Sequence, residues 1–420
     1  MTIGFLTPVT LEAGLLAAFD QGASDLDSRK SAYSKFAKTG LPHRKLEAWK
    51  WSDFRTALSD LPVEQGSGEI QVQAPSIFSQ AGAFTITLDS DGAHWGDNCP
   101  AGVSLRLTDN VADRLDLIDD HPMASLAAAM STETLIITVA AGQSVTAPIH
   151  IRRSGAASDG AQRHHRVLVS IDEDASVGII ESIDEPTGAL FDNLLTEVRL
   201  GARAHLSRTV YSNVGDNGVE ISTCAIVMDE GAVFDQFALL AGGKRSRLET
   251  ISRFDGPDAR ARSFSASILG SARHADFTSE FIHDAEGCIV EQIHKSVIRE
   301  RGHGVFQGKF LVERTGQKTD ANMQANAMLL SEGATINHKP ELEIYADDVA
   351  CAHGSTSGAL DDDAIFYMRQ RGLSDEAARS LLIDAFLAEV FDEMEEAPLV
   401  GARQADILRN VAASWKAGGA

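Results

Sequence analysis

A weak repeat of about 28 residues in the middle of the chain constrains the fold more than any other feature. A small or acidic residue plus alanine precedes an alternating apolar run at four points, with steps of 27, 30 and 27 residues between Ala175, Ala202, Ala232 and Ala259. Such a period, with two or three short strands in it, is typical of a β-solenoid, whose coils bury their interior side chains only by stacking. We therefore expect one solenoid, with a β-sandwich as the alternative.

The two ends of the chain have helical sequence patterns, unlike the strand-like middle. Apolar residues recur at helical spacing before residue 60 and again after residue 355, and Ser374 is a suitable N-cap with two acidic residues directly behind it. We predict an N-terminal helical region at 1–75, a β-helix core at 76–354 and a C-terminal helical domain at 355–420.

Composition excludes several classes of function. The net charge of −23 disfavours nucleic acid and anionic membranes as partners. No run approaches the roughly 18 apolar residues of a membrane span, and the N-terminus lacks the basic start of a secretory signal. The cysteines are far apart and form no CxxC pair, which favours a reducing cytoplasm over a disulfide framework. These cysteines are Cys99, Cys224, Cys288 and Cys351.

Several short motifs have a structural explanation. Lys244 lacks the spacing of a phosphate loop, and the glycines of RGHGVFQGKF (301–310) miss the dinucleotide spacing, so we expect a tight turn into a strand there. RHHR (163–166) is predicted to be a solvated strand start, whose adjacent histidines point to opposite faces. The acidic DDDA (361–364) is expected to cap a helix. Cys224 and Cys288 lie in apolar runs and are predicted to be buried.

Cys351 and His353 are the candidate ligands. They stand two residues apart in DDVACAHG, so on a strand they project from the same face. A thiol and an imidazole suit iron, zinc and sulfide chemistry. Two ligands do not close a site, and further ligands must come from elsewhere in the chain or from another chain.

Three stretches carry a resemblance to a known family. LPHRKLEAWKWSDF (41–54) resembles the N-terminal signature of the SufD family. The segment 305–372 is similar to the C-terminal core shared by SufB and SufD, and the solenoid-like middle extends the likeness over the chain. The resemblance implies a right-handed parallel β-helix flanked by helical regions, in a non-catalytic subunit of the SUF scaffold for iron–sulfur cluster assembly.

The family also implies partners and ligands. The expected partners are a SufB-type subunit and a SufC-type ABC ATPase that docks on the C-terminal helices, with a homodimer as an option for the isolated chain. His353 matches the histidine implicated at the SufB interface, and Cys351 matches its neighbouring cysteine, so both would hold iron or a nascent cluster transiently. A role for Glu343, Asp347 or Asp348 stays open. A flavin is expected only at the level of the complex.

Two other functions compete with this one. A β-helix enzyme acting on acidic polysaccharide would need a groove of acidic and basic residues on stacked coils, and the charge of −23 disfavours a polyanionic substrate. A structural adaptor with a fortuitous Cys-x-His pair is the third interpretation. Co-purification with a SufC-type ATPase, lyase activity and iron–sulfide reconstitution distinguish the three.

Overall fold

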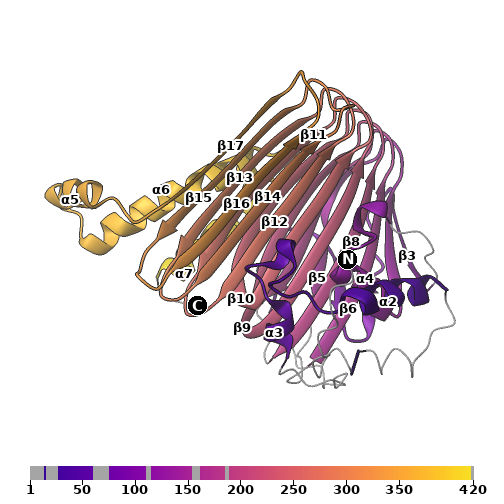
Figure 1. The fold of residues 1–420 in the computed structure, drawn as a ribbon, viewed down its shortest axis with the longest axis horizontal. Coiled ribbons are helices and arrows are strands. Elements are labelled where there is room, and N and C mark those ends of the chain that lie inside the picture. Colours follow the sequence, from indigo (N-terminus) through magenta and orange to yellow (C-terminus); the bar gives the residue numbers. More distant parts are fainter. Residues whose placement is uncertain are drawn as a thin grey trace.

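The protein, as seen in a computed structural model, is a parallel β-helix with helices at its ends and sides (Figure 1). The structure describes residues 14–15, 27–59, 75–109, 115–153, 161–184 and 189–417. The predicted solenoid is confirmed and the sandwich alternative is wrong, because successive strands pair in parallel with strands of the next coil. Most of the apolar run predicted as a helix at 11–19 lies outside the described residues.

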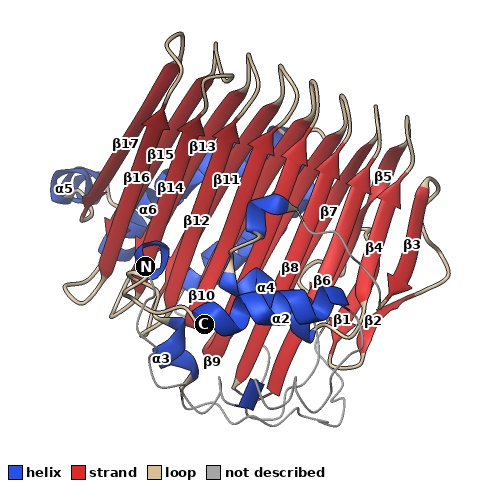
Figure 2. Cartoon of the chain, turned by 45° about the vertical axis from the view of Figure 1, so that its right-hand side comes forward, coloured by secondary structure: helices blue, strands red, loops and turns tan. Residues whose placement is uncertain are grey.

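The solenoid has two walls of stacked strands, and the space between them, here called the interior, holds the main hydrophobic core (Figure 2). Strands β9 and β10 are long and contribute their first halves to one wall and their second halves to the other. The first wall also contains β1 (Phe84–Asp89), β5 (Ser144–Arg153), β7 (Ser176–Asp184), β11 (Arg260–Leu269), β13 (Ile289–Ile298), β15 (Asp320–Leu329) and β17 (Ala350–Gly358). The second contains β4 (Thr134–Val139), β6 (Ala161–Ile171), β8 (Leu190–Leu200), β12 (His274–His283), β14 (His303–Val312) and β16 (Thr335–Ile344), and the shared strands are β9 (His205–Met228) and β10 (Val233–Phe254).

A recurring corner explains the sequence repeat. At one edge of each coil a residue with positive φ precedes a small buried residue, because the tight corner needs a left-handed residue and leaves room for little more than a methyl group. The buried residues are Ala175, Ala204, Ala232, Ala259 and Cys288. Three of these alanines were predicted correctly from the repeat, but the predicted Ala202 lies two residues before the corner alanine, which is Ala204.

The two ends of the solenoid differ. At the N-terminal end, β2 (Gly92–Trp95) pairs antiparallel with β1, and β3 (Val103–Thr108) pairs antiparallel with β4. At the C-terminal end, β16 pairs with β14 and β17 pairs with β15, and no described strand is registered on their far sides. We call the end formed by β16 and β17 the open end.

Helices cover the outer faces of both walls. One group packs over the second wall, from β6 to the second half of β10. It comprises α2 (Asp27–Thr39), η1 (Glu47–Trp49), α3 (Phe54–Leu58), η2 (Asp116–Ile118) and α4 (Pro122–Met130). The other group, α5 (Asp362–Gln370), α6 (Asp375–Glu396) and α7 (Gly401–Lys416), follows β17, and α6 packs on β11 and β13. No helix within the described ranges is long and apolar enough to cross a membrane.

The predicted helix signals at the C-terminal end are present. The Asp361 side chain accepts hydrogen bonds from the backbone N–H groups of Asp363 and Ala364 at the start of α5, and Ser374 caps α6. Acidic DDDA is therefore a capping segment. Residues 355–358, which were predicted to be in the helical domain, instead complete strand β17.

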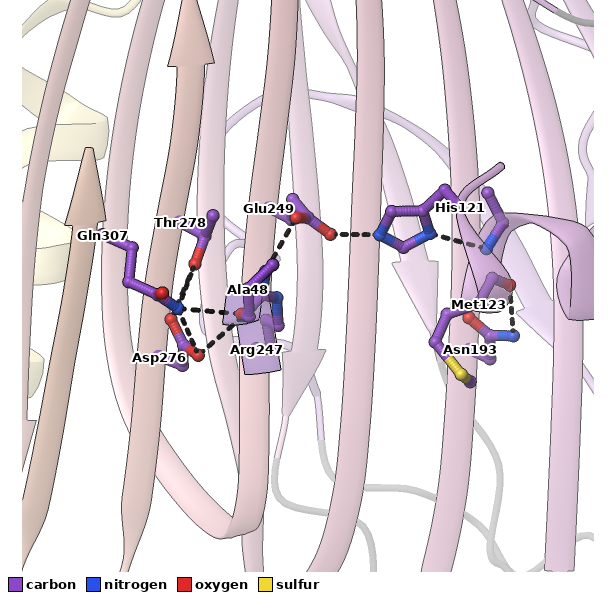
Figure 3. A network of polar contacts seen from close by, with 10 residues as sticks. Ala48, His121, Met123, Asn193, Arg247, Glu249, Asp276, Thr278 and Gln307 are labelled. Atoms are coloured by element: carbon purple, nitrogen blue, oxygen red, sulfur yellow. Dashed lines mark hydrogen bonds and ion pairs between the residues drawn. The ribbon is translucent and has the colours of Figure 1, made fainter. Parts of the chain in front are cut away.

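The signature at 41–54 is anchored on the outer face of the solenoid by a buried arginine (Figure 3). Arg247 Nη1 donates a hydrogen bond to the carbonyl of Ala48 at 2.8 Å, and its guanidinium lies 4.0 Å from the ring centre of Trp49. Its Nη2 donates to Glu249 at 2.8 Å. Because Arg247 is fully buried, these contacts replace the water it lost, so the segment serves to attach the N-terminal region.

The prediction that RHHR (163–166) is a solvated strand start is wrong. His164 and His165 are half-buried, and the Nε2 atom of each is shielded from solvent and has no hydrogen-bond partner among the described residues. Burial lowers the pKa of His164 to about 3 and that of His165 to about 4, so both rings are neutral at physiological pH. Their opposite orientation on β6 is as predicted, since His164 packs against Phe191 on the outer face while His165 shares the parity of the interior residue Val167.

Candidate functional site at the open end

Strand β17 places both candidate ligands on one face. In its register with β15, Cys351 stands beside Ala321 and His353 stands beside Met323, and both of these β15 residues belong to the buried core. Side chains of in-register neighbours on parallel strands point to the same side. Cys351 and His353 therefore share a face, as their spacing predicted, and that face is the interior of the last coil. Strand β17 begins at Ala350 and does not continue from β16.

The candidate ligands are accessible because no further coil in the described part of the chain covers them. Cys351 is half-buried and packs against the edge of the core, whereas His353 is exposed. Burial raises the pKa of the Cys351 thiol above its usual range, and the carboxylate of Asp320 raises it further. The thiol is thus protonated at neutral pH in this state, and binding of a metal as thiolate must release its proton.

The backbone of β17 offers a complete free edge. The N–H of Ala350 donates to the carbonyl of Thr319, the residue directly before β15, so even-numbered residues of β17 bond to β15. The N–H and C=O groups of the odd-numbered residues consequently point to the free side. These residues are Cys351, His353, Ser355 and Ser357, the same four whose side chains face the interior. Unpaired groups along a strand are a template for strand addition by another chain.

The neighbouring edge on β16 is interrupted. The N–H of Thr335 donates to the carbonyl directly before β14, and the N–H of Tyr345, directly after β16, donates to Val312 at the end of β14. The backbone groups of odd-numbered residues of β16 therefore point to β14, and those of even-numbered residues point to the free side. Pro340 is even-numbered and has no N–H, so the free edge of β16 lacks a donor near its middle. Of the two walls at the open end, the one ending in β17 is therefore better suited to continuous pairing.

The acidic residues near the pair do not join it. Glu343 lies on the outer side of β16, where its carboxylate is 3.3 Å from Lys309 Nζ. Asp347 and Asp348 are exposed at the corner between β16 and β17, and the backbone of Asp348 bonds to Gln317 and Lys318. Across the described part of the chain, no three histidine, cysteine, aspartate or glutamate side chains are placed to hold a metal ion.

The sequence pointed to the candidate ligand pair and to an open edge at each end of a solenoid, but not to the interruption of the β16 edge by Pro340. The role of Pro340 depends on whether the backbone groups of even-numbered residues of β16 point to β14 or to the free side. The pairing of β16 with β14 determines this, and the sequence alone does not show it. A proline within an otherwise alternating run, NHKPELEI, was the available signal for an edge strand.

Comparison with known proteins adds a family likeness. Residues 153–386 match the family model described as "SUF system FeS cluster assembly, SufBD core domain". This range covers most of the solenoid from the end of β5 and continues through α5 into α6.

Individual relatives agree with that match. The chain is 29% identical to the iron–sulfur cluster assembly protein SufD of Escherichia coli, covering 86% of each protein. It is 28% identical to a SufBD family protein of Synechocystis, covering 93% of this chain and 90% of the relative. The SufB protein of Bacillus subtilis is 22% identical, over 66% of this chain and 59% of that relative.

Proposed function

The chain belongs to the SufBD family of SUF-system iron–sulfur cluster assembly proteins, and from this membership we propose that it is the SufD-type scaffold subunit. In this role it does not catalyse a reaction on its own. It pairs with a SufB-type subunit, carries a SufC-type ATPase and helps to acquire iron for a cluster built between the two solenoids. The observation that carries the proposal is the coincidence of the ligand pair with the free edge of β17.

The free edge explains how a partner completes the site. A strand of a SufB-type subunit that pairs with β17 brings its own side chains over the interior of the last coil, because neighbouring strands lie about 4.8 Å apart. Cys351 and His353 then supply two ligands and the partner supplies the rest. An incomplete site with exchangeable ligands suits a cluster that must later be released. Without the partner, a second copy of the chain is the alternative occupant of the edge.

The C-terminal helices are the proposed docking surface for the ATPase. Large apolar side chains are exposed on α5, on the first half of α6 and on the turn between these helices, and such surface is typical of interaction sites. They are Phe366, Tyr367, Leu373 and Leu381. Strand β17 ends at Gly358 and α5 begins at Asp362, so movement of these helices would be transmitted directly to the edge strand.

The test is cluster assembly by a complex of this chain with a SufB-type subunit and a SufC-type ATPase, reconstituted anaerobically with Fe²⁺ and sulfide. We expect His353→Ala to lower the rate of cluster formation at least about tenfold, the scale on which loss of metal-site interactions acts. His94→Ala is the matched control, because His94 is an exposed histidine on β2 at the opposite end of the solenoid. Assembly at the wild-type rate by the His353 variant would show that the site is assigned wrongly.

A further inference from the structure

A methionine fills the interior directly beneath the candidate ligands. Met323 on β15 is fully buried and stands in register with His353 on β17. Its side chain reaches across the interior to Gly308 on β14, where a Cβ would lie 2.5 Å from the Met323 sulfur and 2.8 Å from its terminal methyl carbon. No side chain could replace the hydrogen of Gly308 while Met323 keeps this position.

The sequence predicted a tight turn into a strand at 301–310, and the chain does turn at 300–301 and enter β14 at His303. Gly308 lies in the middle of β14, on its interior face beside Pro340 of β16. Glycine within a strand weakens it and usually marks a close approach by another group. Here the approaching group is the thioether of Met323, so the glycine makes room for a sulfur atom one coil below the open end.

The donors around the open end are soft or borderline metal ligands. Cys351 offers a thiol, His353 an imidazole and Met323 a thioether, all from the interior faces of the last two coils. Carboxylates are absent from the interior row of β17, whose remaining members are Ser355 and Ser357. Soft thiolate and thioether ligands select Cu(I), whereas carboxylate and water suit harder ions.

We propose that the open end of the chain binds Cu(I) through Cys351, His353 and Met323. The inference rests on the proposed placement of the ligand pair, and it names the metal that this chain would hold in the absence of a partner. Methionine has three rotatable bonds and a polarisable sulfur, so the Met323 side chain can turn from Gly308 towards the open end without movement of the backbone. The same feature makes the unpaired subunit vulnerable to copper at the place where iron is to be handled.

The experiment is an anaerobic titration of the full-length chain with Cu(I) delivered from its bicinchoninate complex. The wild-type protein is expected to remove one Cu(I) per chain from the chelator. Met323→Leu conserves volume and should cost less than about 1.5 kcal/mol of stability, so the fold is retained. This variant is expected to bind Cu(I) at least about tenfold more weakly, and Cys351→Ser more weakly still.

Met328→Leu is the matched control, because Met328 lies on the same strand but packs against the cluster on the outer face. It should bind Cu(I) as the wild type does. Equal Cu(I) affinity of the Met323→Leu and wild-type proteins overturns the proposal, and so does a wild-type chain that takes no Cu(I) from the chelator. Either result leaves the assembly function intact if His353→Ala still slows cluster formation in the complex, so the two failures can be told apart.

Discussion

His294 is a buried histidine whose surroundings make the stability of the solenoid depend on pH. Its ring packs nearly parallel to the rings of Phe277 and Phe306, with centroid distances of 5.4 and 5.1 Å. Its two nitrogens bond to the hydroxyl groups of Ser265 and Ser296. Burial, with a smaller contribution from nearby His338, lowers the pKa of His294 to about 3. The site accepts a neutral ring and rejects a charged one.

A pH dependence of stability follows from that pKa. His294 takes up a proton near pH 6.5 in the unfolded chain but only near pH 3 in the folded chain. The free energy of unfolding that depends on His294 is therefore at its full value above pH 6.5 and decreases as the pH falls below 6.5. One such histidine accounts for about 2 kcal/mol between pH 6.5 and 5. We expect His294→Gln to reduce, by about that amount, the difference in unfolding free energy between pH 7 and 5, measured in urea. An unchanged difference would show that His294 is not held neutral.

At the level of strands, the open end has two free edges that differ in their capacity for continuous pairing. The free edge of β17 is continuous, whereas Pro340 removes a donor from β16. Natural solenoids cover or interrupt long edges because unpaired strands associate. The complete edge of the nine-residue strand β17, with the candidate ligands facing the interior behind it, supports the proposal that a partner pairs with it.

Replacing Ser355 by proline tests the edge without disturbing the coil. The N–H of Ser355 points to the free side, so its loss removes no bond to β15, and proline is tolerated at such edge positions. We expect the isolated variant to unfold at a urea concentration close to that of the wild type. In size-exclusion chromatography with a SufB-type subunit, it should fail to form the complex. Thr356→Pro is the control, since it breaks the β15 ladder and should lower stability. A Ser355 variant that forms the complex normally would refute pairing through β17.

The sequence predicted some of these elements and could not predict others, for physical reasons. The corner repeat near Ala175 and Ala232 was readable because every coil needs a small buried residue after a left-handed one. The shared face of Cys351 and His353 was readable from strand geometry alone. The place of Gly308 was not, because its neighbour Met323 is 15 residues away and meets it only across the interior. Burial of His164 likewise depends on contacts with another coil.

For the molecule as a whole, the two ends of the solenoid differ in structure, and this difference leaves the surfaces for partners at the C-terminal end. Antiparallel strands close the N-terminal end, helices cover parts of both outer faces, and the C-terminal end stays open beside α5 and α6 (Figure 1). We therefore propose that the subunit partner and the ATPase act at adjoining surfaces. One uses the edge of β17 and the other uses the helices that follow it.

Substitutions on α5 test that separation. Phe366 and Tyr367 are 63% and 60% exposed, so changing both to serine removes apolar contact surface with little effect on the core. We expect the double variant to lose binding to a SufC-type ATPase in a pull-down while its complex with a SufB-type subunit survives. The control is Leu107→Ser, which changes an exposed apolar residue at the N-terminal end. Retention of the ATPase by the double variant would place the docking surface elsewhere.

Residue-resolved amide hydrogen exchange on β17 tests the central claim most directly. In the isolated chain, the N–H groups of Cys351, His353 and Ser355 face the free side and should exchange fast, whereas those of Ala352 and Gly354 bond to β15 and should be protected. Addition of a SufB-type subunit is predicted to protect the first set and leave the second nearly unchanged. If the free-side amides exchange equally fast with and without that subunit, the open edge is not the assembly interface.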